Sequence, residues 1–186
     1  RAFAQSIKDL SAEEQRDRFG QTFRIGRLGV LGGETQMVPV PVMRLIPEAT
    51  RYTVVAELPT MSRPLYETLH TGVPVSVHGV TNNRVVRRST MPNVFEQVVR
   101  HGRTTGASAY WWFSELYNRV PFDPIADREA DDPALAIQHG RFYTEDDMPD
   151  REVFAAGATL VHRLQPDYVL IHPMGMDHLG ETYGAD

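Results

Sequence analysis

The chain has 186 residues, a net charge of −5, and hydrophobic and charged fractions of 41% and 23%, which are typical of one globular domain. It contains no cysteine, which excludes disulfides, thiolate metal sites and a cysteine nucleophile. The 19 Lys and Arg residues are scattered, so no nucleic-acid-binding surface is evident, and no run of about 18 apolar residues predicts a membrane-spanning helix.

The first 50 residues fit no clear fold pattern. Residues 11–14 (SAEE) form a capping box that predicts a short polar helix, and residues 23–30 (FRIGRLGV) have the composition of a strand. Residues 1–5 (RAFAQ) contain no apolar signal core, and both a cytoplasmic and an exported location stay open. We therefore expect an unassigned N-terminal segment over residues 1–50 and an α/β domain over residues 51–186.

Strands and helices alternate after residue 50. The β-branched apolar run 52–56 (YTVVA) predicts a buried strand, and a helix is expected from Pro64 to His70. Apolar residues at helical spacing predict a second helix over residues 93–100. The next strand is expected over residues 104–112.

The last third of the chain continues this alternation. Residues 123–149 are rich in acids and prolines and are expected to be irregular. Asp150 is predicted to cap a helix that runs to Leu164, and residues 168–172 (YVLIH) predict another buried strand. The pattern as a whole indicates an α/β domain with a largely parallel sheet.

Ser62 is the first candidate for chemistry, because it follows a predicted strand and precedes a predicted helix. In open α/β sheets, ligands bind beyond the carboxyl ends of the strands. The N-terminus of a helix offers free N–H groups and partial positive charge, which suit a phosphate group. A serine placed there is a plausible nucleophile if a divalent metal lowers its pKa. The alternative is that Ser62 only caps the helix.

Several fixed spacings around Ser62 occur together: Ser62, Pro64, Leu69 and Thr71-Gly72, followed by Pro74 and His78-Gly79. This pattern resembles the nucleophile region of phosphodiesterases and nucleotide pyrophosphatases in the alkaline phosphatase superfamily. The resemblance implies a three-layer α/β sandwich, of which this chain contains an incomplete part, with Ser62 as nucleophile and metal ligand. Tyr66 stands where the related sulfatases need an arginine, which disfavours a sulfatase.

The resemblance also concerns the substrate side of the site. Asn83 lies five residues after His78, where relatives often have an asparagine, although a turn asparagine is the alternative. We expect Tyr66 and Asn83 to line the substrate side of Ser62.

The second candidate motif follows the predicted strand 168–172. An acid and a histidine come just after this strand, and carboxylate and imidazole are good zinc ligands. The segment resembles the family sequence Asp-x-x-Gly-His-x-x-Gly, with Asp177 at its first position. Glu181 stands where the family has its histidine ligand, and His178 is the alternative source of an imidazole. For Asp177 itself, a loop acid or a helix cap is the alternative to a metal ligand.

Together the two motifs imply a hydrolase of small-molecule phosphate esters that uses two divalent metal ions, with zinc expected. Metal ligands would be Ser62, Asp177 and either Glu181 or His178. The family's first metal-binding strand and its later Asp-His-Gly have no counterpart here, so the chain is expected to be a fragment with an incomplete site. A non-catalytic or diverged binding domain, and a phosphoryl or phosphoethanolamine transferase, are the alternative functions.

Overall fold

A computed structural model describes residue 56 and residues 58–183 of the chain, of which residues 58–182 belong to one compact unit. The predicted helix near residue 11 and the predicted strand over residues 23–30 lie outside the described residues, as does nearly all of the strand predicted over residues 52–56. The predicted boundary at residue 50 therefore stays a prediction. Within the described residues, every helix is too short or too polar to cross a lipid bilayer.

The described residues form a four-stranded sheet in the order β2-β3-β1-β4. Strand β1 (Thr105–Tyr110) runs parallel to β3 (His139–Tyr143) on one side and to β4 (Tyr168–Ile171) on the other. Strand β2 (Glu129–Asp131) pairs antiparallel with β3. The expected α/β class with a largely parallel sheet is confirmed, while the more specific alkaline-phosphatase-like sandwich stays a prediction.

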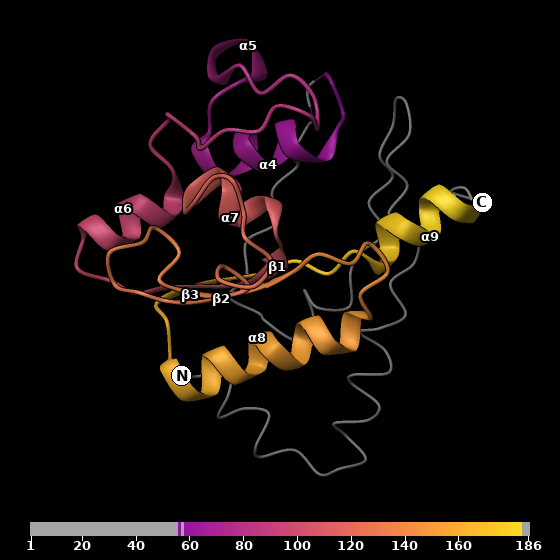
Figure 1. Cartoon of the computed structure of the whole chain (residues 1–186). Coiled ribbons are helices and arrows are strands. Elements are labelled where there is room, and N and C mark those ends of the chain that lie inside the picture. Colours follow the sequence, from indigo (N-terminus) through magenta and orange to yellow (C-terminus); the bar gives the residue numbers. More distant parts are fainter. Residues whose placement is uncertain (1–55, 57, 184–186) are drawn as a thin grey trace, which may run out of the picture. The chain divides into compact units, whose positions relative to one another are not determined.

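Helices cover both faces of this sheet (Figure 1). Helix α8 (Asp150–Leu164) lies on one face, and α6 (Val94–Arg100) and α7 (Trp112–Tyr117) lie on the other. All six residues of β1 are buried, as expected for a strand covered on both faces, and five of them are Gly, Ala, Ser or Thr. Small side chains allow close approach, and a Cβ on Gly106 would come within 3.1 Å of the Pro166 ring.

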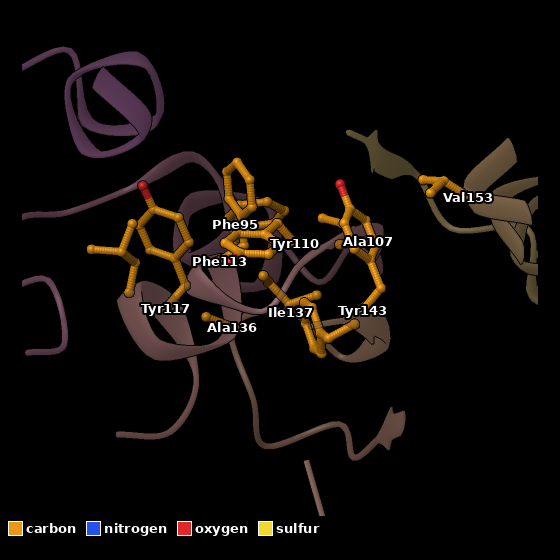
Figure 2. Packing of buried hydrophobic residues seen from close by; sticks show 12 residues of the cluster. Phe95, Ala107, Tyr110, Phe113, Tyr117, Ala136, Ile137, Tyr143 and Val153 are labelled. Carbon is orange, nitrogen blue, oxygen red and sulfur yellow. The ribbon is translucent and has the colours of Figure 1, made fainter. Parts of the chain in front are cut away.

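The core beside β1 is mainly aromatic (Figure 2). Phe95 from α6 is fully buried and packs its ring 5.3 Å from the rings of Tyr117 and Tyr168. Phe113 and Tyr117 come from α7, which places most of this aromatic surface on the face of the sheet opposite α8. The two helices α6 and α7 are therefore fixed to the sheet by large, shape-specific side chains.

Within the described part of the chain, two helices precede these elements. The helix predicted from Pro64 to His70 is confirmed as α4 (Ser62–Thr71), which ends at Gly72 with a φ of 70°, a conformation that glycine adopts at low cost. A short helix α5 (Val75–His78) follows. The last described helix is α9 (Gly175–Tyr183).

The prediction of an irregular segment over residues 123–149 was wrong in part, because it contains β2 and β3. The sequence of β3, HGRFY, mixes charged, small and aromatic residues, so neither an apolar run nor a clean alternation marks it as a strand. The strand predicted over residues 104–112 ends earlier than expected, at Tyr110, because Trp112 already belongs to α7.

Helix α8 has the predicted bounds, but Asp150 does not cap it. Pro149 is the N-cap residue, and the Asp150 carboxylate instead accepts the backbone N–H of Gly175 at 2.8 Å. Along this helix, Val153, Gly157 and Leu160 are buried, whereas Phe154, Val161 and Leu164 are about 40% exposed. Strand β4 is only half-buried, since β1 is its one partner within the described sheet.

Candidate functional site

Ser62 is the first residue of α4, and its side chain is half-buried. Met61 occupies the N-cap position and makes no side-chain capping bond, so Ser62 does not cap the helix in the way the alternative interpretation required. The hydroxyl therefore sits in the first turn of a ten-residue helix, where backbone N–H groups lack acceptors within the helix.

Asn83 reaches this helix end from the segment between α5 and α6. Its side-chain Oδ1 accepts the backbone N–H of Arg63 at 3.0 Å, across a sequence separation of 20 residues. The amide oxygen is thereby directed at the helix, and the amide nitrogen has no hydrogen-bond partner among the described residues. Asn83 thus lies beside the predicted nucleophile, with two N–H donors left for another group.

Tyr66 lies one turn after Ser62 in α4, and its hydroxyl lies near the Ser62 side chain. Its ring stacks on Phe113 at 4.4 Å, which fixes the side chain in place. Burial raises the pKa of the Tyr66 hydroxyl well above its ordinary value, and the negative charge of Asp177 raises it further. The hydroxyl therefore stays protonated at neutral pH and cannot act there as a base.

Asp177, in the first turn of α9, is exposed, and its charge acts on both Tyr66 and His172. The second predicted motif therefore lies on the same side of the molecule as the hydroxyl that contacts Ser62. His178 and Glu181 are also exposed on α9. Glu181 lies four residues after Asp177 and so shares its helix face, whereas His178 points about a quarter turn away.

The predicted metal ligands do not form a complete set in the part of the chain that the structure describes. Among those residues, no group of three or more His, Asp or Glu side chains is arranged to hold a metal ion. Asp177 and its neighbours on α9 have the right donor atoms for zinc but supply too few of them at one point. The two-metal arrangement therefore stays a prediction.

His172, which was not among the predicted site residues, lies directly after β4 and packs against Tyr66. Its ring lies 4.9 Å from the rings of both Tyr66 and Phe113, and its backbone carbonyl accepts the Tyr143 hydroxyl at 2.6 Å. Burial lowers the pKa of the His172 imidazole to about 4, with the nearby Asp177 charge opposing the shift. The position directly after a buried strand was the one sequence signal that could have indicated it.

Arg63 was also missed, because an arginine in the first turn of a helix is usually exposed. Here it is 1% exposed, and its guanidinium donates to the buried Glu115 carboxylate at 2.8 Å and lies 4.6 Å from the centre of the Trp112 ring. This ion pair joins α4 to α7 directly beneath the predicted nucleophile. Its charges compensate each other, so Arg63 is not available as an anion-binding residue.

A separate hollow of about 210 Å³ opens between α8 and β3. Its two arginines are already paired, Arg128 with Glu145 at 3.3 Å and Arg141 with Asp131 at 2.9 Å. Ser62 does not line it, and the serine that does, Ser108, donates its hydroxyl to the Val153 backbone carbonyl at 2.7 Å and so faces no base. The start of α4 is therefore the stronger candidate for chemistry.

Comparison of the chain with protein-family models, with curated proteins and with solved structures found no match. The resemblance to the alkaline phosphatase superfamily accordingly rests on the two sequence motifs alone.

The depressed pKa of His172 predicts a specific loss of stability in acid. The folded protein holds this imidazole neutral down to about pH 4, whereas the unfolded chain binds a proton near pH 6.5. Stability from this group is complete above pH 6.5, and about 1.4 kcal/mol is lost for each pH unit as the pH falls toward 4. His172→Phe, which keeps the aromatic packing, should show a shallower loss than the unchanged protein in urea unfolding between pH 6.5 and 4.5 with a chelator present. Equal slopes would contradict the assignment.

Proposed function

We propose that the chain carries the nucleophile of a phosphoric-ester hydrolase that acts on small-molecule phosphate esters. The observation that supports the proposal most directly is the convergence of Ser62, Tyr66 and Asn83 at the start of α4, with the charge of Asp177 acting on the same Tyr66 hydroxyl. All three residues were expected at this site from the family resemblance.

In the proposed reaction, the Ser62 oxygen attacks phosphorus and forms a P–O bond while the ester oxygen leaves on the opposite side. The serine proton is balanced by the proton that the leaving alcohol gains, and water then cleaves the phosphoseryl intermediate. Asn83 donates an N–H to a phosphoryl oxygen, and Tyr66, which stays protonated, holds the serine hydroxyl in position. The partial positive charge at the N-terminus of α4 favours the anion.

No step of this reaction is assigned to a metal, because the described residues do not gather a complete ligand set. Divalent metal binding is a separate part of the proposal, in which Asp177, with Glu181 or His178, holds one of two ions, zinc being expected. A bound cation would lower the pKa of a serine hydroxyl and polarise phosphoryl oxygens. The incomplete ligand set is also the observation that favours the competing function, a non-catalytic domain of the same fold.

Replacing the nucleophile tests the hydrolase proposal. Ser62→Ala should lower turnover of bis(4-nitrophenyl) phosphate by about 1,000-fold or more, since the residual rate comes only from binding. Ser76→Ala, at an exposed position of α5, is the matched control and should keep full activity. Full turnover by Ser62→Ala would remove the nucleophile from the proposal. No turnover by the unchanged protein with zinc supplied would favour the non-catalytic domain.

Substitutions at Asn83 separate substrate binding from helix capping. Asn83→Asp keeps an oxygen that can accept the Arg63 N–H but removes the donor, so it should preserve stability and raise KM for a phosphodiester about tenfold or more through charge repulsion. Asn83→Ala should lose both functions and destabilise the protein by about 1 kcal/mol. Asn82→Asp adds the same charge one residue away and is the control. If Asn83→Asp leaves KM unchanged, Asn83 only caps.

Metal binding is tested without relying on activity. The affinity for zinc, measured by equilibrium dialysis, should be lower in Asp177→Asn by a factor of about 10 or more, because a carboxylate ligand is lost. Asp147→Asn, an exposed acid outside the site, is the control. Glu181→Gln and His178→Ala, compared directly, identify the second ligand. Unchanged zinc affinity in Asp177→Asn would show that Asp177 is not a ligand.

A further inference from the structure

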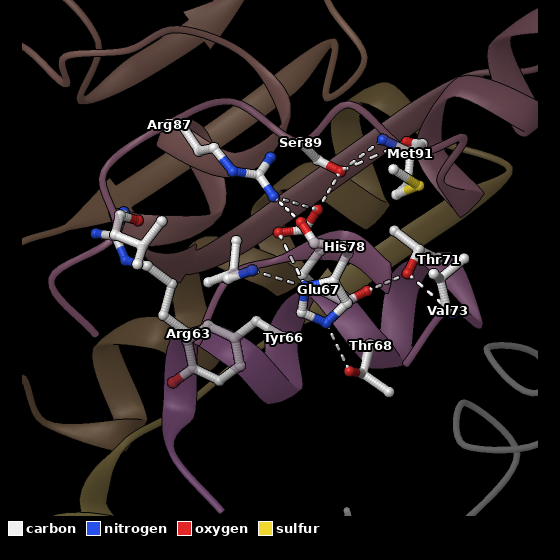
Figure 3. A network of polar contacts seen from close by, with 12 residues as sticks. Arg63, Tyr66, Glu67, Thr68, Thr71, Val73, His78, Arg87, Ser89 and Met91 are labelled. Atoms are coloured by element: carbon white, nitrogen blue, oxygen red, sulfur yellow. Dashed lines mark hydrogen bonds and ion pairs between the residues drawn. The ribbon is translucent and has the colours of Figure 1, made fainter. Parts of the chain in front are cut away.

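The segment that carries Asn83 has no regular secondary structure of its own. It runs from Gly79, after α5, to the N-cap Asn93 of α6. A loop of this length cannot by itself hold an amide group at a fixed distance from a catalytic atom. Its position must come from the contacts it makes, and these are mostly with polar side chains of α4 (Figure 3).

Three side chains of α4 hold this segment and the end of α5. Arg63 donates to the carbonyl of Val85 at 3.3 Å, and Thr68 is hydrogen-bonded to the His78 ring at 2.9 Å. Between them, Glu67 accepts the Ser89 hydroxyl at 2.7 Å. Two residues of α4 therefore hold the segment around Asn83. Arg63 contacts it close to Asn83, and Glu67 contacts it farther along the helix.

Glu67 is the unusual member of this set, because its carboxylate is fully buried. One oxygen receives the Ser89 hydroxyl and lies 3.8 Å from the Arg87 guanidinium. The other has no hydrogen-bond partner and lies 3.8 Å from Nδ1 of His78. A buried carboxylate with an unpartnered oxygen is costly, and an apolar side chain would pack there at lower cost.

The neighbouring histidine lies 3.8 Å from this carboxylate without hydrogen-bonding it. Nδ1 of His78 instead accepts the backbone N–H of Val80 at 3.1 Å. The guanidinium that faces Glu67 is that of Arg87, which also donates to the carbonyl of His78. Arg87 and Ser89 both belong to the segment that carries Asn83, so the buried charge specifically attracts that segment.

We infer that Glu67 is a positioning residue, which anchors residues 79–93 along α4 through Ser89 and Arg87 and so keeps the Asn83 amide beside Ser62. Its effect on catalysis rests on the proposed function, whereas its effect on the position of Asn83 does not. A buried charge is retained here because it selects one register of the loop on the helix, which apolar contacts alone do not.

The position of Asn83 has a direct reporter, the backbone N–H of Arg63. This N–H belongs to the first turn of α4, has no acceptor within the helix, and is bonded to Asn83. Glu67→Gln keeps the acceptor for Ser89 and removes the charge. It should lower hydrogen-exchange protection of the Arg63 amide about tenfold or more relative to the amide of Ala107 in β1, which reports global stability.

Two further variants make this measurement decisive. Glu96→Gln removes the partly exposed partner of Arg88, a residue of the same segment, and should leave the Arg63 amide protected. If Glu67→Gln does not fold, Arg87→Gln, whose side chain is 30% exposed, removes the other half of the attraction and should give the same selective loss. Unchanged relative protection at Arg63 in whichever of these variants folds would overturn the inference.

A double-mutant cycle tests the catalytic consequence. If Glu67 acts through Asn83, Glu67→Gln should lower kcat/KM in the unchanged background and have little further effect in Asn83→Ala. Additive losses would overturn the inference. Failure of the proposed function is distinguishable, because full activity of Ser62→Ala would refute the nucleophile while leaving the exchange result at Arg63 intact.

Discussion

The hydrogen bond from the Arg63 N–H to the Asn83 side chain is the contact on which the site depends. Every helix begins with N–H groups that have no acceptor within the helix, and in α4 the N-cap residue, Met61, cannot supply one. The acceptor comes instead from 20 residues away. One hydrogen bond thus satisfies the helix end and also brings the Asn83 amide close to the proposed nucleophile, Ser62.

Two buried polar side chains of α4 connect this helix to the rest of the fold. Arg63 joins α4 to α7 through Glu115, and Glu67 joins α4 to the Asn83 segment. Both are almost fully buried, and each leaves one polar atom without a partner, Nε of Arg63 and Oε2 of Glu67. Both atoms belong to α4, so the stability that they cost is lost on the helix that carries the proposed nucleophile, Ser62.

The sequence was sufficient to predict the elements that have a strong apolar period. It was insufficient where the burial of charged residues decides the structure. Helices α4, α6 and α8 were predicted within two residues at each end, from the proline in the first turn of α4 and from the apolar spacing of α6 and α8. Strand β3, which pairs with the central strand β1, was not predicted, because its charged and small residues do not form an apolar or alternating pattern. The site showed the same division. Ser62, Tyr66 and Asn83 were expected from motifs that resemble a known family, whereas Glu67 and His172 acquire their surroundings only from the fold.

Charge balance at the start of α4 gives a physical reason to expect a cation there. Burial keeps Tyr66 protonated and His172 neutral at pH 7, and it also lowers the pKa of His70, which hydrogen-bonds the Tyr66 carbonyl. Arg63 is compensated by Glu115, and Asp177 adds a negative charge. Among the described side chains that contact Ser62 or Tyr66, none therefore brings an uncompensated positive charge. The helix end contributes only about half an elementary charge, which is too little to balance both a phosphate ester and a carboxylate. An anionic substrate held at Ser62 would consequently bind more strongly with a divalent ion at Asp177, so metal and substrate affinities at this site should rise together.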